Sequence, residues 1–116
     1  MNAIAQNAYR HAGRVSKTPQ ETEAALLARF SAAMQSARDF STLAAAVSDN
    51  LRLWNALADD LVSPGNALPD ALKGQLVWLA EFTRLHSGRV LQGEADAAAL
   101  IDINNAVMRG LNGKAA

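Results

Sequence analysis

Hydrophobic residues in this sequence recur mainly at intervals of three and four positions. The clearest stripe, in the middle of the chain, consists of Leu43, Val47, Leu51, Trp54, Ala58 and Leu61. Its mean step is close to the period of an α-helix, so these side chains share one helical face. Leu53 and Leu57 lie beside the stripe and widen the apolar surface. The pattern predicts an amphipathic helix that begins near Asp39 or Ser41 and ends near Val62.

Two further helices are predicted from start signals and apolar stripes. In the sequence TPQE, Thr18 can be the N-cap, Pro19 suits the first helical position and Glu21 completes a capping box. The core face of this helix would consist of Leu26, Leu27, Phe30, Ala33, Met34 and Ala37. The last helix follows the sequence GEAD, and its core face would consist of Leu100, Ile103, Val107 and Leu111. Gly110 and Gly113 are expected to mark its end.

The helix predicted from Pro69 to about Leu91 carries two apolar stripes. The first consists of Leu72, Leu76, Leu79 and Val90, with Thr83 and His86 between them. The second consists of Trp78, Phe82 and Leu85, rotated by roughly 100° from the first. A helix that packs on one side needs only one stripe. The second stripe is therefore either covered by the N-terminal segment or by the helix that begins at TPQE, or kept for a partner.

The sequence DDLVSPGNALPDAL separates the middle helix from the two-striped one. Because Ser63 precedes a proline, it is pushed out of helical geometry and the middle helix must stop there. Gly65 can supply a positive φ for the reversal. We interpret Pro64, Gly65, Asn66 and Pro69 as a structural elbow between two helices.

The exact start of the next helix is left open by the sequence. If Pro69 is the first helical residue, the N-cap is Leu68, which is a poor cap, whereas Asn66 is the better capping residue. Asp70 then lies in the first turn, where its charge complements the helix dipole.

The remaining segment, from about Ala3 to Val15, is short and only weakly amphipathic. We expect a short helix there, within a mobile N-terminal segment over residues 1–16, and a loose tail over residues 112–116. No alternating strand of useful length is present. The sequence predicts a single all-α domain over residues 1–116. Its architecture would be a small antiparallel bundle of four main helices plus the short N-terminal one.

Composition narrows the function. Half of the 116 residues are hydrophobic, and eleven basic residues balance eleven acidic ones. Direct nucleic-acid binding is usually accompanied by a basic excess, so it is not expected. The chain has no cysteine, which excludes disulfides and cysteine-based zinc sites. No apolar run approaches the roughly 18 residues of a membrane span, and no secretory signal is recognised, so we expect a cytoplasmic protein.

Few residues suggest chemistry. His11 and His86 match no metal-ligand spacing, and His86 is expected to be a buried histidine with a hydrogen-bond partner. Asp59 and Asp60 are adjacent on a helix, so their side chains diverge and cannot form a close catalytic pair, although Asp70 could approach them across the elbow. We predict no metal, no cofactor and no enzymatic activity.

Several segments resemble the FlaF family of flagellar biosynthesis regulators from alphaproteobacteria. The resemblance covers roughly Ala8 to Leu111. Its most specific parts are the Ala8-Tyr9 start, the TP.E.E capping region, LW..L at Leu53 to Leu57, PGNALP at Pro64 to Pro69, and LIDIN..VM.GL. The N-terminal portion has a shorter similarity to FliS, the flagellin export chaperone, which is likewise a small helical bundle.

The resemblance implies a role in flagellin production and export, opposed to the flagellin-mRNA regulator FlbT. It also implies that the protein binds flagellin as a chaperone for the flagellar type III export system. The terminal regions of flagellin are expected to be amphipathic helices that are disordered before assembly. An alternative is a post-transcriptional regulator that acts through FlbT or flagellin mRNA. A basic cluster of Arg10, His11, Arg14 and Lys17 could serve RNA, or could simply be a solvated helix face.

On the chaperone hypothesis, the flagellin helix would lie in a hydrophobic groove. We predict that Trp78, Phe82 and Leu85 line it together with Leu53 and Leu57. The N-terminal segment would cover this groove through Ile4 and Tyr9 when flagellin is absent.

Overall fold

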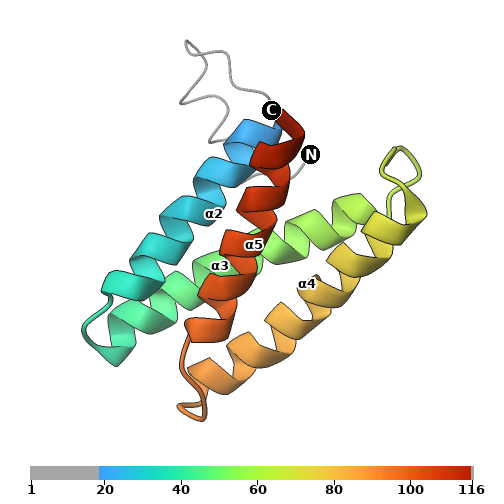
Figure 1. The fold of residues 1–116 in the computed structure, drawn as a ribbon. Coiled ribbons are helices and arrows are strands. Elements are labelled where there is room, and N and C mark those ends of the chain that lie inside the picture. Colours follow the sequence, from blue (N-terminus) through green and yellow to red (C-terminus); the bar gives the residue numbers. More distant parts are fainter. Residues whose placement is uncertain (1–18, 116) are drawn as a thin grey trace.

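Four helices make up the part of the chain that the structure describes. The computed structural model describes the backbone of residues 19–115 and the side chains of residues 21–110 (Figure 1). The helices are α2 (Pro19–Ser36), α3 (Phe40–Leu61), α4 (Asp70–Leu91) and α5 (Ala98–Ala115), and no strand occurs within those residues. The predicted all-α bundle of four main helices is confirmed. The predicted N-terminal helix and its groove-covering residues Ile4 and Tyr9 lie outside the described residues.

The helices form two antiparallel pairs that cross each other (Figure 1). α2 lies beside α5, and α3 lies beside α4. α2 also packs on α3, whereas α4 and α5 have little contact with each other. They meet at the loop that joins them and diverge from there, α5 toward the start of α2 and α4 toward the elbow (Figure 1). No helix within residues 19–115 is both long enough and apolar enough to cross a membrane.

The core has two neighbouring parts. One consists of Leu26, Leu27, Phe30, Leu53, Trp54 and Ala80. The other consists of Met34, Ala46, Val47, Val90, Ala97 and Leu100. The stripes predicted for α2, α3 and α5 supply most of these residues, so the periodic pattern placed their core faces correctly within the described side chains.

The start of α3 is fixed by its first residues. Asp39 has an extended backbone and is the N-cap. Its Oδ1 accepts hydrogen bonds from the backbone N–H and the hydroxyl of Thr42, each at 2.7 Å. The hydroxyl and then the backbone hydrogen bond lower the pKa of the Asp39 carboxyl. Of the two predicted starts, Asp39 is therefore confirmed, and the helix begins at Phe40.

The predicted end of α5 is wrong. The helix continues through Gly110 and Gly113 to Ala115. A glycine inside a helix costs only about 0.5–1 kcal/mol relative to alanine, so it does not by itself stop a helix that packs against a neighbour. α5 packs along α2, and this contact outweighs the local preference.

The elbow also differs from the prediction in its backbone. Gly65 does not have a positive φ; among the described residues only Gly93, after α4, does, at 77°. The N-cap of α4 is Pro69, which makes no side-chain hydrogen bond. Both predicted N-caps, Leu68 and Asn66, are therefore wrong. Asp70 does lie in the first turn, as expected.

Asn66 instead holds the elbow together. Its Oδ1 accepts from the backbone N–H of Leu68 at 3.0 Å, and its Nδ2 donates to Asp60 Oδ2 at 3.3 Å. Its backbone carbonyl accepts from Lys73 Nζ at 2.8 Å. One asparagine therefore links the end of α3, the loop and the first turns of α4.

Candidate partner-binding groove

The surroundings of α4 change halfway along the helix. Its buried residues are Ala80, Thr83, Ser87 and Val90, and all lie within residues 80–91, which we call its C-terminal half. The N-terminal half has no fully buried side chain, although Leu72, Leu76 and Leu79 face inward and are partly covered. This half lies where α4 has diverged from α5 (Figure 1), and its leucines are only partly buried.

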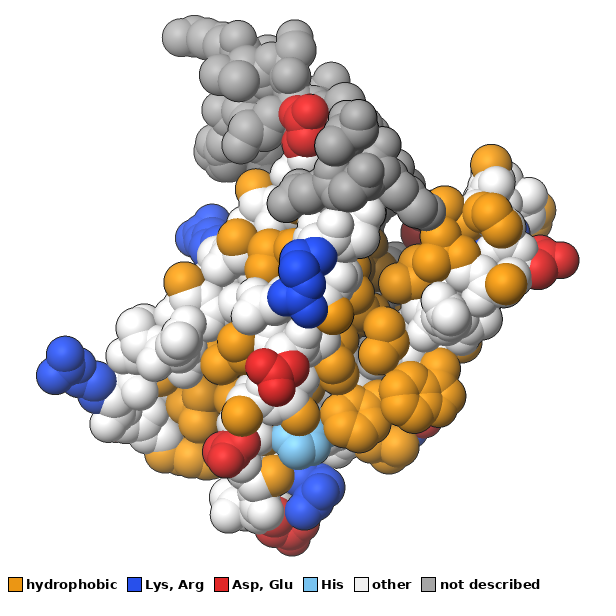
Figure 2. Space-filling view, viewed as in Figure 1, with side chains coloured by type: hydrophobic (Ala, Val, Ile, Leu, Met, Phe, Trp, Pro, Cys, Tyr) orange, Lys and Arg blue, Asp and Glu red, His pale blue; other side chains and the backbone are white. Residues whose placement is uncertain are grey.

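The divergence leaves an open groove of about 290 Å³. Its floor is the C-terminal half of α3, with Trp54, Leu57 and Leu61. One wall is α4 and the elbow, which contribute Asn66, Leu68, Leu72, Gln75, Leu76 and Leu79. The other wall is α5, with Ala106, Val107 and Gly110, and Glu23, Leu27 and Asp60 complete the lining. Figure 2 shows hydrophobic side chains gathered between α5 and α4.

The predicted site residues fall into three places. Leu57 lines the groove. Leu53 does not: it is 0% exposed and packs in the core against residues of α2, so it cannot touch a partner there. Trp78, Phe82 and Leu85 lie together on a neighbouring face of α4, which we call the α4 ridge.

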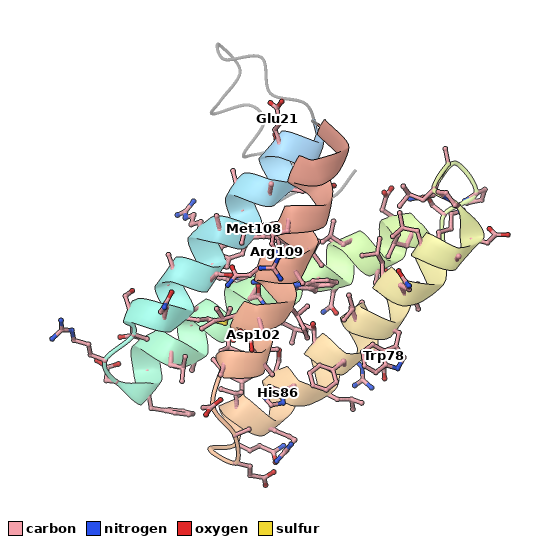
Figure 3. All side chains as sticks on the ribbon, in the orientation of Figure 1. Glu21, Trp78, His86, Asp102, Met108 and Arg109 are labelled. Atoms are coloured by element: carbon pink, nitrogen blue, oxygen red, sulfur yellow. The ribbon has the colours of Figure 1, made fainter. Side chains whose placement is uncertain are left out.

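The α4 ridge is an exposed surface. Trp78 is 65% and Leu85 is 55% exposed, so α2 does not cover this stripe. Trp78 projects from α4 on the side away from α5 (Figure 3). Leu79 lines the groove and also a shallow hollow beside Trp78, which places the ridge directly next to the groove.

A stacked series of rings continues the ridge toward α5. The rings of Trp78 and Phe82 are stacked with centroids 5.8 Å apart, and those of Phe82 and His86 with centroids 5.5 Å apart. His86 Nε2 donates to the backbone carbonyl of Asp96 at 2.9 Å, since a carbonyl can only accept. The predicted hydrogen-bond partner of His86 is therefore found in the loop before α5, but its predicted burial is wrong, because the side chain is only partly buried (Figure 3).

The groove contains two carboxylates. Burial raises the pKa of the Glu23 carboxyl, and the negative charge of nearby Asp60 raises it further. Asp59 is exposed and does not line the groove. Within the described residues, no three side chains of the metal-binding types lie close enough together to hold a metal ion.

The model of the family described as flagellar protein FlaF matches residues 5–111. The chain belongs to the FlaF family. The resemblance read from its motifs is thereby confirmed, and the protein is a flagellar one. Searches of curated proteins and of solved structures gave no match.

In this FlaF-family chain, the groove floor rests on a buried polar network that the sequence analysis missed. Trp54 Nε1 donates to Asn104 Oδ1 at 2.8 Å. Asn104 Nδ2 donates to Ser31 Oγ at 3.0 Å and to Asn50 Oδ1 at 2.7 Å. All four residues are buried, and together they join α2, α3 and α5.

A signal for this network was present in the sequence. Asn104 follows Leu100 by one helical turn, and Asn50 lies between Val47 and Trp54, so both fall on core faces. A polar residue on a core face must find a hydrogen-bond partner there. What the sequence does not reveal is which side chains of other helices provide it.

Proposed function

We propose that this FlaF-family chain binds flagellin as a chaperone, and that it thereby promotes flagellin synthesis and type III export. The observation that carries the proposal is the open apolar groove between α3, α4 and α5. Apolar surface of this kind, which the described helices leave open beside an exposed tryptophan, is typical of a site for another protein segment.

The groove suits an amphipathic helix. Such a helix presents apolar side chains at intervals of three and four residues, which pack into a hydrophobic groove. Leu57, Leu72 and Leu76 offer apolar surface from the floor and one wall. On the opposite wall Ala106 and Gly110 are small, which leaves room for a partner backbone to approach α5.

The α4 ridge would provide a second contact. Large aromatic side chains account for much of the energy at protein interfaces, and Trp78 is exposed without any function in the core. Because Leu79 borders both surfaces, a helix in the groove passes close to the ridge. Coverage of these surfaces by Ile4 and Tyr9 stays a prediction.

Binding of this kind would be coupled to folding of the partner. The terminal regions of flagellin are expected to form amphipathic helices that are disordered before assembly. Ordering them costs conformational entropy, and burial of an apolar face in the groove offsets that cost. A chaperone that binds the apolar face also prevents flagellin molecules from associating through it before export.

The test is direct binding of purified chain to full-length flagellin, measured by size-exclusion chromatography and calorimetry. Leu76→Asp places a charge in the groove and is expected to abolish the complex. Its matched control is Val77→Asp, the next residue of α4, which lines no part of the groove. Trp78→Ala combined with Phe82→Ala should weaken binding while circular dichroism remains unchanged.

Absence of a complex between the unmodified chain and flagellin would contradict the proposal. A pull-down with FlbT as bait tests the alternative, in which the protein acts through FlbT. A chain that captures FlbT but not flagellin would act through that regulator without holding flagellin itself. Salt-sensitive binding to flagellin leader RNA would point instead to direct action on the message.

A further inference from the structure

Two carboxylates, those of Glu23 and Asp60, lie in a largely apolar groove. Glu23 comes from the first turns of α2, and Asp60 comes from the last turn of α3. α4, α5 and the elbow contribute no charged residue to the lining. A single sign of charge inside a docking surface selects among partners, because it favours one complementary group and disfavours its opposite.

Asp60 is held in position by the elbow. Its Oδ2 accepts from Asn66 Nδ2 at 3.3 Å. Lys73, in the first turns of α4, donates from Nζ to the backbone carbonyl of Asn66 at 2.8 Å. Asp60 therefore presents a fixed negative charge at the groove, with a neutral amide as its hydrogen-bond donor.

Neither carboxylate forms an ion pair with another residue of the range 21–110. Within residues 21–110, the ion pairs join Arg52 to Asp49 and Arg84 to Glu81, all of them outside the groove. Partial burial and the charge of Asp60 together raise the pKa of Glu23, so the free protein disfavours the charged form of this group. A cation brought in from outside would relieve both the repulsion and the missing solvation.

We infer that the occupant of the groove is an amphipathic helix that presents a lysine or arginine to Glu23 and Asp60. The inference rests on the proposed function, in which this helix belongs to flagellin. Its apolar face packs against the leucines of α3 and α4, and its basic side chain lies at the end formed by the start of α2 and the elbow. Because the charge lies at one end of the groove, it fixes the direction of the bound helix, which apolar packing alone would not do.

The experiment is calorimetric titration of full-length flagellin into the chain and its variants at several salt concentrations. Glu23→Gln and Asp60→Asn keep the shape of each side chain and remove its charge. Each is expected to raise the Kd about ten-fold, as removal of one partner of a charge pair does. Each should also reduce the dependence of the Kd on salt.

Matched controls separate this effect from overall charge. Glu94→Gln removes a carboxylate from the loop before α5, and Asp102→Asn removes one from the exposed side of α5, labelled in Figure 3. Neither lines the groove, so neither should change the Kd. Thermal melts of all four variants verify that they are folded.

The outcomes are distinct. If flagellin binds the unmodified chain but Glu23→Gln and Asp60→Asn leave both the Kd and its salt dependence unchanged, the inference is overturned and the proposed function stands. If the two control variants weaken binding equally, general charge attraction replaces the specific contact. If the unmodified chain forms no complex, the proposed function fails, and the inference fails with it.

Discussion

The two halves of α4 have the same helical backbone but different surroundings. The C-terminal half buries Ala80, Thr83, Ser87 and Val90 in the core. The N-terminal half buries no side chain fully, and its leucines form one wall of the groove. A single continuous helix therefore stabilises the bundle with one half and offers a surface with the other. The division falls between Leu79 and Ala80.

The direction of α5 produces this difference. At the C-terminal half of α4, the connecting loop keeps α5 close, and Ala97 and Leu100 pack with Val90. Farther along, α5 follows α2 and leaves α4 (Figure 1). Local sequence alone does not create the groove, since both halves of α4 carry apolar residues on the same face.

The largest expected effect separates the two halves directly. Val90→Asp places an unpaired charge in the core and is expected to cost at least about 4 kcal/mol, enough to abolish cooperative folding. Leu76→Asp places the same charge in the open groove, where water can reach it, and should leave a folded protein. Denaturant titrations followed by circular dichroism measure both. Equal loss of stability in the two variants would contradict the division of α4.

The network beneath the groove gives the next effect. Asn104→Leu leaves Trp54 Nε1, Asn50 Oδ1 and Ser31 Oγ without their partner in the core. Each buried group that loses its hydrogen bond costs about 1–3 kcal/mol, so for three groups we expect a loss of at least about 3 kcal/mol in the free energy of unfolding and a shift in the fluorescence of Trp54. Asn105→Leu, at the neighbouring position, is the control and should have a much smaller effect on the denaturation midpoint.

A change in the elbow is expected to have a smaller effect on the stability of the whole protein and a larger effect on the local stability of the N-terminal half of α4. Asn66→Ala removes the side-chain hydrogen bonds to Leu68 and Asp60, with an expected cost of about 1 kcal/mol. Hydrogen exchange should become faster in residues 70–79 and remain unchanged in residues 80–90. Asn55→Ala, on the exposed side of α3, serves as the control. Faster exchange along all of α4 would show that its halves are not independent.

The smallest effect is a difference in pH dependence between two carboxyls. The raised pKa of Glu23 means that its charged form opposes folding, and this penalty disappears as the pH falls through the raised pKa. The lowered pKa of Asp39 means that its charged form favours folding, and this contribution is lost as the pH falls through the lowered pKa.

Variants that remove these two carboxyls should therefore change the stability of the protein in opposite directions. At neutral pH Glu23→Gln is expected to be more stable than the unmodified chain and Asp39→Ala less stable. Both differences should narrow when melts are repeated in steps from about pH 7 down to about pH 3. Deviations of the same sign would show that the groove does not penalise the charge of Glu23.

Sequence reasoning succeeded where one helix decides the outcome. The period of α3 is a local feature and was predicted correctly, and its start at Asp39 is one of the two positions that the sequence predicted. The prediction that Leu53 lines the groove was wrong, because its position beside the stripe does not show which helix covers it. In the structure α2 covers it. The prediction of a positive φ at Gly65 was wrong because several loop geometries can reverse the direction of a chain. The hydrogen bonds of Asn66 stabilise one that does not need a positive φ there.

The candidate site could be predicted only where it depends on a single helix. Two apolar stripes on α4 indicated two surfaces, and the exposure of Trp78 agrees with one of them being free of the core. The groove itself depends on the divergence of α5 from α4, which is a property of the tertiary arrangement. Glu23 and Asp60 are far apart in the sequence, and only the crossing of α2 and α3 brings both to one groove.

The loop after α4 has a consequence for the shape that a partner must have. It joins the two walls of the groove at one end only, with Gly93 making the turn and His86 fastened to the carbonyl of Asp96. The helices α4 and α5 are consequently close together near this loop and far apart near the elbow (Figure 1). A helix bound between two walls that diverge needs smaller side chains where the walls are closer and larger ones where they are farther apart, so the order of side-chain sizes along its apolar face would set the direction in which it lies.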